Sequence, residues 1–193
     1  MPELAELAAE IGSLTIFEFL SVAASIVLAL GLSTLITSIP YVFDARKRDW
    51  LHGLAFVALV LGHILAWWRI WPLNSVANWN ILGFAILMGT PLSLYLAATA
   101  LVSKNPDQVE SWKEKFSDNS RWLFSALAAV WIFGILRGYV LLDRTPPWWS
   151  LVMLAGFAVA ASSNRRRLHI AALFIFVLVF AALIYFNFSA PML

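Results

Sequence analysis

Six long apolar stretches separated by short polar breaks occupy most of this 193-residue chain. They cover residues 14–39, 50–71, 80–103, 121–142, 148–163 and 168–188. About 20 helical residues cross a hydrocarbon core of about 30 Å, and every stretch except 148–163 reaches that length. The short stretch needs a thinner bilayer or burial among its neighbours. The pattern predicts an all-α, polytopic integral membrane protein, with six transmembrane helices in a single domain over residues 1–193.

Prolines and glycines predict where these helices end or bend. Pro40 and Pro72 are expected to close the first two helices, because proline cannot donate the next backbone hydrogen bond. Gly89 and Pro91 lie inside the third stretch and predict a kink that frees backbone carbonyls. Broken helices of this kind occur at transporter sites, although prolines are also common in ordinary membrane helices.

Basic residues are concentrated in alternate connections, which predicts the orientation of the chain. Ten of the thirteen lysines and arginines lie in the first, third and fifth connections. They are Arg46, Lys47, Arg48, Lys104, Lys113, Lys115, Arg121, Arg165, Arg166 and Arg167. Positively charged connections stay in the cytoplasm, so both termini are predicted outside, on the periplasmic side. The clusters of the first and fifth connections, Arg46 to Arg48 and Arg165 to Arg167, are expected to attract anionic lipid headgroups rather than nucleic acid.

Two polar segments border the apolar stretches. Residues 1–12 carry apolar positions at helical spacing beside three glutamates, which predicts an amphipathic helix on the outer surface or, alternatively, a frayed terminus. Residues 104–120 form the sizeable cytoplasmic loop. The modest interpretation of this loop is an interfacial helix that turns Trp112 and Phe116 towards lipid.

Four ionisable residues inside the stretches are the candidate functional groups, because bare charges are costly in hydrocarbon. Glu18 shares a helical face with Ser21, Ser25, Ala29 and Ser33, and this small-residue stripe predicts that it faces the bundle.

Arg137 is predicted at the depth of Glu18, Arg69 slightly closer to the outer surface and His63 deeper, all in the outer half of the bundle. The sharp hypothesis is an ion pair of Glu18 with Arg137 or Arg69, with His63 one or two turns below. Three interpretations stay open: a structural clasp, the lining of an outward-facing cavity for an anion, a proton or a small polar solute, and an oligomer contact.

Composition and motifs exclude several other classes of protein. With 62% hydrophobic and 12% charged residues and a mean hydropathy of +0.82, the chain cannot be a soluble domain. The chain has no cysteine, hydrolase elbow, zinc-protease motif or nucleotide fingerprint. His52 and His169 begin spans at a similar depth and could in principle ligate one haem. Histidines beside basic loops are more often interfacial, so we expect no cofactor and no metal.

One resemblance covers most of the chain. FEFLSVAASIVLALGLSTL, followed by a basic turn and HILAWWRIW, resembles small bacterial six-helix inner-membrane proteins of unknown function, and the later RWLF and RRRLH fit the same pattern. The resemblance implies a multi-pass protein of the bacterial inner (cytoplasmic) membrane and implies no activity.

The sequence therefore predicts a small membrane channel or transporter for an ion, a proton or a small polar solute, forming a homo-oligomer. The alternatives are a non-catalytic membrane subunit that docks a partner protein, through Gly156 with Ala160 or the first-helix stripe, and a membrane enzyme acting on lipid.

Overall fold

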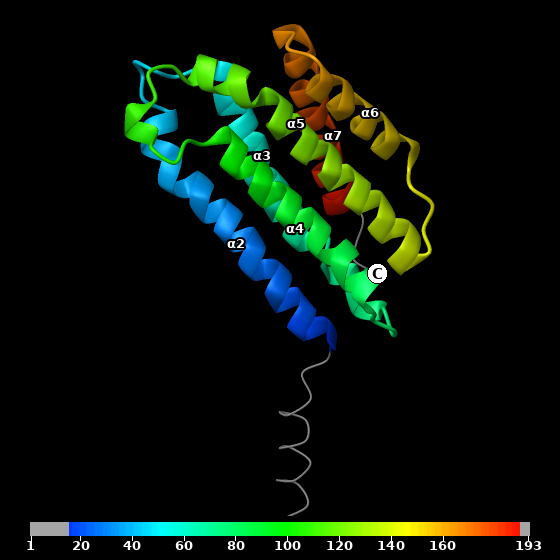
Figure 1. Cartoon of the computed structure of the whole chain (residues 1–193). Coiled ribbons are helices and arrows are strands. Elements are labelled where there is room, and N and C mark those ends of the chain that lie inside the picture. Colours follow the sequence, from blue (N-terminus) through cyan, green and yellow to red (C-terminus); the bar gives the residue numbers. More distant parts are fainter. Residues whose placement is uncertain (1–15, 190–193) are drawn as a thin grey trace, which may run out of the picture.

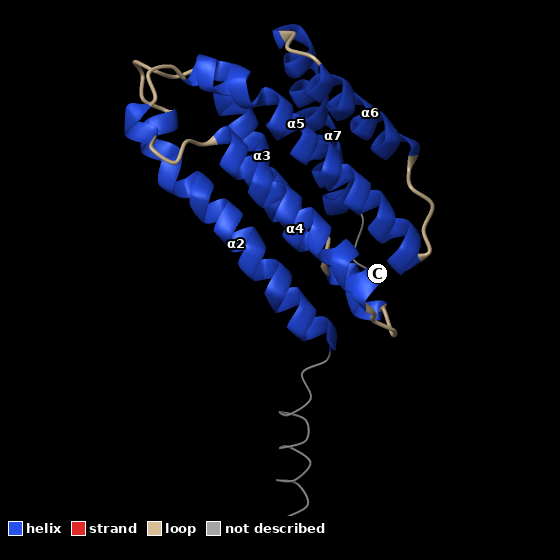
Figure 2. Ribbon diagram, viewed as in Figure 1, coloured by secondary structure: helices blue, strands red, loops and turns tan. Residues whose placement is uncertain are grey.

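The computed structural model describes residues 16–189, and within them the fold is all-helical without a strand (Figure 2). The α-helices are α2 (Ile16–Val42), α3 (Trp50–Trp68), α4 (Ile81–Leu101), α5 (Trp112–Leu136), α6 (Trp148–Ser162) and α7 (Arg166–Ser189). Five helical segments are long and apolar enough to cross a membrane, and α6, with 15 residues, is shorter. The all-α prediction is confirmed, and the helices are consistent with a multi-pass membrane protein. The predicted amphipathic segment 1–12 lies outside the described residues.

Three helices begin at side chains that cap their first turn. Asp49, Asn80 and Ser111 each have an extended backbone and precede α3, α4 and α5. Each side chain accepts a hydrogen bond from the backbone N–H three residues later, at 3.1, 2.8 and 3.4 Å. These bonds satisfy donors that the first turn of a helix leaves without partners. The polar breaks thus fix where the apolar helices start.

The helices form two layers, with a front row in the order α2, α4, α5 and α6, and with α3 and α7 behind it (Figure 1). α3 contacts α2, α4, α5 and α7, so it lies at the centre of the bundle. α2 contacts α3 and α4 at one edge, whereas α6 packs against α5 and α7 at the other. The first and fifth predicted spans are therefore peripheral.

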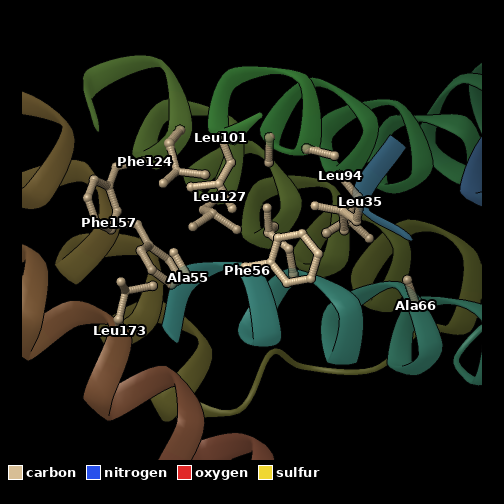
Figure 3. Packing of buried hydrophobic residues seen from close by; sticks show 14 of the residues in the cluster. Leu35, Ala55, Phe56, Ala66, Leu94, Leu101, Phe124, Leu127, Phe157 and Leu173 are labelled. Carbon is tan, nitrogen blue, oxygen red and sulfur yellow. The ribbon is translucent and has the colours of Figure 1, made fainter. Parts of the chain in front are cut away.

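The interior is filled by apolar side chains from all six α-helices, α2 to α7 (Figure 3). Phe124 and Phe157 are fully buried, and their rings stack with centroids 6.1 Å apart. Since lipid tails are as apolar as these side chains, close packing rather than exclusion from water holds such helices together. Gly89 of α4 illustrates this closeness, because a Cβ atom added there would overlap the ring of Phe133 on α5.

The three basic connections meet at one end of the bundle, and the connection between α3 and α4 lies at the opposite end (Figure 1). We call the first the basic end and the second the arginine end, because it holds Arg69, Arg137 and Arg144. Side-chain bonds join the basic connections to one another. They are Arg166 to Asp49 at 2.6 Å, Arg121 to Asn164 at 3.2 Å, and Lys47 to the Asp107 carbonyl at 3.2 Å.

α2 continues through Pro40, so the prediction that this proline closes the first helix is wrong. A proline in a last turn removes only one backbone hydrogen bond, and tertiary contacts here hold the turn in place. Val42 is buried, and Nε1 of Trp112 donates a hydrogen bond of 2.8 Å to the Tyr41 carbonyl. The prediction that Pro72 closes the second helix is closer to the structure. α3 ends at Trp68, and Pro72 lies just beyond it in the short 3₁₀ helix η1 (Trp71–Ser75).

Trp112 and Phe116 do not turn towards lipid, which corrects the interpretation of the third connection. α5 begins at Trp112, so half of the predicted loop is the first part of a long helix. Both side chains are buried, and the Trp112 ring lies 4.7 Å from the imidazole of His52. Trp112 faces the bundle because its ring packs against the His52 imidazole of α3 and its indole N–H donates to the Tyr41 carbonyl.

Candidate functional site

A cavity of about 190 Å³ lies at the arginine end of the bundle and is bordered by three arginines. Arg69 is the C-cap residue of α3, and Arg137 follows the last residue of α5. Arg144 comes from the connection to α6, which also lines the cavity with Pro146 and Pro147. The end of α3 and the segment that follows α5, distant from each other in sequence, thus bring three arginines to one cavity.

The backbone after α5 is irregular where it carries these arginines. Arg137 opens a π-helical turn, η3 (Arg137–Leu141), a local widening that is frequent at functional sites. Asp143 then takes a left-handed conformation, with φ of 48°, and the N–H of Arg144 donates to the Gly138 carbonyl at 2.9 Å. This bond spans six residues, so it closes the widened helical end and returns the chain over the turn that holds Arg137.

The charge of this cavity is not balanced by any acid on its wall. Arg137 is only 5% exposed, and Arg69 is half-buried. Within residues 16–189, neither guanidinium has a hydrogen bond or an ion pair to a side chain. Among the described residues, no aspartate or glutamate borders the cavity. A buried cation of this kind needs a counter-charge or water, since its burial alone is unfavourable.

A second, deeper cavity of about 50 Å³ shares Arg69, Trp131, Gly134 and Arg137 with the first. Its inner wall includes Thr90 of α4, and it ends against apolar side chains of the core. The buried Thr90 Oγ1 and Trp131 Nε1 have no hydrogen-bond partner among the described residues. Buried polar groups are normally satisfied, so these two atoms point to a ligand or to water.

Glu18 is exposed on α2 rather than facing the bundle, whereas Ser21 and Ser25 of the same stripe are half-buried and Ser25 Oγ accepts a hydrogen bond from Trp67 Nε1 of α3. The buried face of α2 carries Leu20, Ala24 and Leu28 instead, whereas Ala29 is exposed with Glu18. These apolar residues form the inward face of α2 because they fill its interface with α3 and α4.

The predicted ion pair is also not formed. Across residues 16–189, the structure pairs Glu18 with neither Arg69 nor Arg137, and Glu18 borders neither arginine-lined cavity.

His63 is buried, as its central position on α3 requires, but it faces α2 rather than the arginines. Its Nδ1 donates a hydrogen bond of 2.7 Å to the Leu59 carbonyl, so Nε2 is the acceptor nitrogen. A Cβ atom at Gly31 of α2 would overlap Nε2, and this nitrogen has no partner in the described part of the chain. His63 borders neither cavity, and it is therefore a packing residue between α2 and α3 in this structure.

α4 is assigned as one uninterrupted helix through Gly89 and Pro91, and both residues are buried. Ser93 donates a hydrogen bond of 2.7 Å to the Gly89 carbonyl, which supplies a local partner beside the proline. Gly89 serves the close approach of Phe133, and a functional kink at this point stays a prediction.

His52 and His169 lie near each other at the basic end, with the ring of Phe116 against both. The centroid of Phe116 lies 6.4 Å from that of His52 and 5.8 Å from that of His169. Nε2 of His52 lies 3.0 Å from the Leu101 carbonyl, and Nε2 of His169 lies 2.8 Å from that of Ser163. Each imidazole thus has a backbone partner, and within residues 16–189 no cluster of histidine and acidic side chains could hold a metal ion.

The basic clusters predicted to meet anionic headgroups are on the surface. Arg46, Arg48, Arg165 and Arg167 are exposed, whereas Arg166 pairs with Asp49. Their binding to lipid stays a prediction.

Sequence reasoning found Arg69 and Arg137 but missed three of their neighbours. Arg144 could have been added, because it is the third basic residue outside the basic connections. Trp131 was distinctive as a tryptophan inside an apolar stretch. Thr90 stood out only as a hydroxyl beside Pro91, and no spacing rule connects it to α5.

Comparison with known proteins adds no family to this description: no protein-family model, no curated protein and no solved structure matches the chain. The assignment therefore depends on the geometry alone. It defines an all-helical protein with helices suited to cross a membrane and with an acid-free, arginine-lined cavity at one end.

Proposed function

We propose that this protein is a small membrane channel or transporter that admits a small anion through the arginine-lined cavity. The observation that carries the proposal is Arg137, a buried arginine that, within residues 16–189, has no side-chain partner and lies at a cavity without an acidic residue on its wall. A guanidinium presents several N–H donors and no acceptor, so the partner it lacks is an anion.

The other polar groups of the two cavities support the same ligand. Arg69 and Arg144 add positive charge at the entrance, and the indole N–H of Trp131 adds a donor further in. The Thr90 hydroxyl can also donate. The cationic guanidinium groups and the indole N–H can only donate, and the hydroxyl groups of Thr90, Thr145 and Ser150 are neutral, so the side chains of the two cavities favour an anion over a cation. An entrance of about 190 Å³ accommodates a small inorganic or carboxylate anion with some water.

The positions of the cavities suggest a route. The larger cavity lies at the arginine end, which the distribution of basic residues predicts to be periplasmic. The smaller cavity continues inward from Arg137 and stops at Leu94 and Leu127. In the proposed cycle an anion enters from outside, binds at Arg137, and passes inward when α4 and α5 separate at these leucines.

Liposome flux tests the proposal directly. The purified full-length chain is reconstituted in liposomes, and uptake of chloride, nitrate, formate and phosphate is measured against protein-free liposomes. Loss of a hydrogen bond to a charged group costs about 1.5–3 kcal/mol, so Arg137→Gln should reduce the flux of the preferred anion by roughly 10-fold to 150-fold.

Arg167→Gln is the matched control, because it removes one positive charge from an exposed position at the other end. This variant should retain flux. The proposal is wrong if all four anions cross no faster than in protein-free liposomes, or if Arg137→Gln and Arg167→Gln behave alike.

A second candidate function, a non-catalytic subunit that docks a partner protein, is favoured by the exposed face of α2. Ala29 and Ser33 are exposed there with Glu18, and small residues allow another helix to approach closely. The other predicted docking pair, Gly156 with Ala160 on α6, is less suitable. The space beside Gly156 is open, but Ala160 is already buried inside the bundle and cannot contact a partner. Ala29→Leu should release a stoichiometric partner on purification if this function is correct, and leave anion flux unchanged.

A further inference from the structure

We propose that a groove between α4 and α5 at the basic end binds one anionic phospholipid, with its phosphate at Lys104 and Lys115. The groove has a volume of about 900 Å³ and shares no lining residue with the two arginine-lined cavities. No part of the proposed anion route uses it, so the two proposals stand independently.

One wall of the groove is a single face of α5. Lys115, Asn119, Trp122, Ala126 and Ala129 follow one another at spacings of four and three residues, which places them on one side of a helix. The stripe from Lys115 to Ala129 is about 21 Å long at 1.5 Å per residue. It passes from charged through aromatic to small apolar residues, the same order that a phospholipid presents from headgroup to acyl chain.

The opposite wall has the same polarity. Leu96 and Ala100 of α4 form its apolar part, and the chain that follows α4 adds Ser103, Lys104 and Asn105. The small side chains of Ala100, Ala126 and Ala129 leave the trough in which an acyl chain fits. Trp122, 75% exposed, stands at the transition, where tryptophan prefers the level of the lipid headgroups.

Charge selects the headgroup. Neither Lys104 nor Lys115 forms an ion pair within residues 16–189, and no carboxylate lines the groove. The acidic residues of the same region lie outside it: Asp107, Glu110, Glu114 and Asp118. A phosphate in the groove therefore contacts the two lysine ammonium groups and no carboxylate, whatever the net charge of the surrounding region. A choline headgroup would bring a third cation beside them, so an anionic lipid is preferred.

Native mass spectrometry of the full-length protein in detergent measures this preference. The protein is titrated with phosphatidylglycerol and, separately, with phosphatidylcholine of the same acyl chains. A lysine near an anionic lipid gives roughly a fivefold gain in affinity, so the two together predict roughly 30-fold tighter binding of phosphatidylglycerol. Lys104→Gln with Lys115→Gln should abolish the difference, whereas Lys113→Gln with Arg167→Gln, of equal net charge, should keep it.

A second variant tests the apolar half of the groove without changing charge. Ala129→Leu fills the trough and should weaken phosphatidylglycerol binding, whereas Ala85→Leu, at an exposed position of α4 outside the groove, should not. Equal binding of the two lipids by the wild-type protein overturns the proposal. It is also overturned if Ala129→Leu has no effect, or if glycerol phosphate competes as well as the intact lipid, because the occupant would then be a soluble phosphate.

Discussion

Replacing Arg137 by methionine should make the protein more stable and at the same time unable to bind its anion. The guanidinium is 5% exposed and has no partner within residues 16–189, so the folded state bears an uncompensated desolvation cost. Methionine is apolar, similar in length, and able to fill the space. Replacing buried charges by well-packed apolar side chains gains up to about 1–4 kcal/mol, and contact with the cavity reduces the gain to about 2 kcal/mol here.

The two effects can be separated by thermal unfolding in detergent. For a chain of this size about 1 kcal/mol shifts Tm by about 2–4 °C, so Arg137→Met should raise Tm by about 4–8 °C without added anion. An anion at 100 times its Kd stabilises the wild-type protein by about 2.7 kcal/mol, or about 5–11 °C, and should leave the variant unchanged. Arg167→Met, at an exposed site, should alter neither value.

This reasoning is refuted if Arg137→Met lowers Tm in the absence of anion, because the arginine would then be a structural clasp. It is refuted equally if the same anion stabilises the variant and the wild-type protein to the same extent, because the ligand would then bind elsewhere.

Three further substitutions test the packing and capping that position the site. Gly89→Ala should destabilise the fold by about 1–3 kcal/mol, because its Cβ meets the Phe133 ring, and Phe133→Leu in the same chain should restore part of the loss in thermal unfolding. Gly31→Ala should loosen α2 by displacing His63, which limited proteolysis detects as faster cleavage near residue 43. Asp49→Ala should cost about 2 kcal/mol or more, since it removes both a helix cap and an ion pair, whereas Asp49→Asn should lose less because it keeps the cap.

The helices could be predicted from the sequence because long apolar runs in lipid have few other ways to satisfy their backbone. The start of α4 at Asn80 is a good example, since the cap and the beginning of the apolar run coincide. The end of α2 was missed at Pro40, where a contact from Trp112, 72 residues further on, outweighs the local preference of proline.

The faces of the helices were harder to predict than their lengths. The stripe from Glu18 to Ser33 suggested the inward face of α2, yet both residues are exposed, because leucines elsewhere on the helix fill the seam. A helix that is apolar on all sides carries no periodic signal to identify its neighbours. Counting along the helices placed both Arg69 and Arg137 towards the same end of the bundle, and the structure shows them at one cavity there. Their common cavity depends on α3 and α5 being adjacent, which counting does not reveal.

The bonds that join the three basic connections also have a mechanical meaning. Arg166 of α7 pairs with Asp49 at the start of α3, and Arg121 of α5 bonds Asn164 between α6 and α7, so both bonds tie helices together at the basic end. At the arginine end, Nε1 of Trp67 on α3 donates a hydrogen bond of 3.2 Å to Ser25 Oγ on α2, and this bond does not involve α5. Rigid-body rocking of α5 and α6 is therefore expected to pivot about the tied end, so that displacement is greatest beside Arg137 and the entrance widens while the far end keeps its bonds.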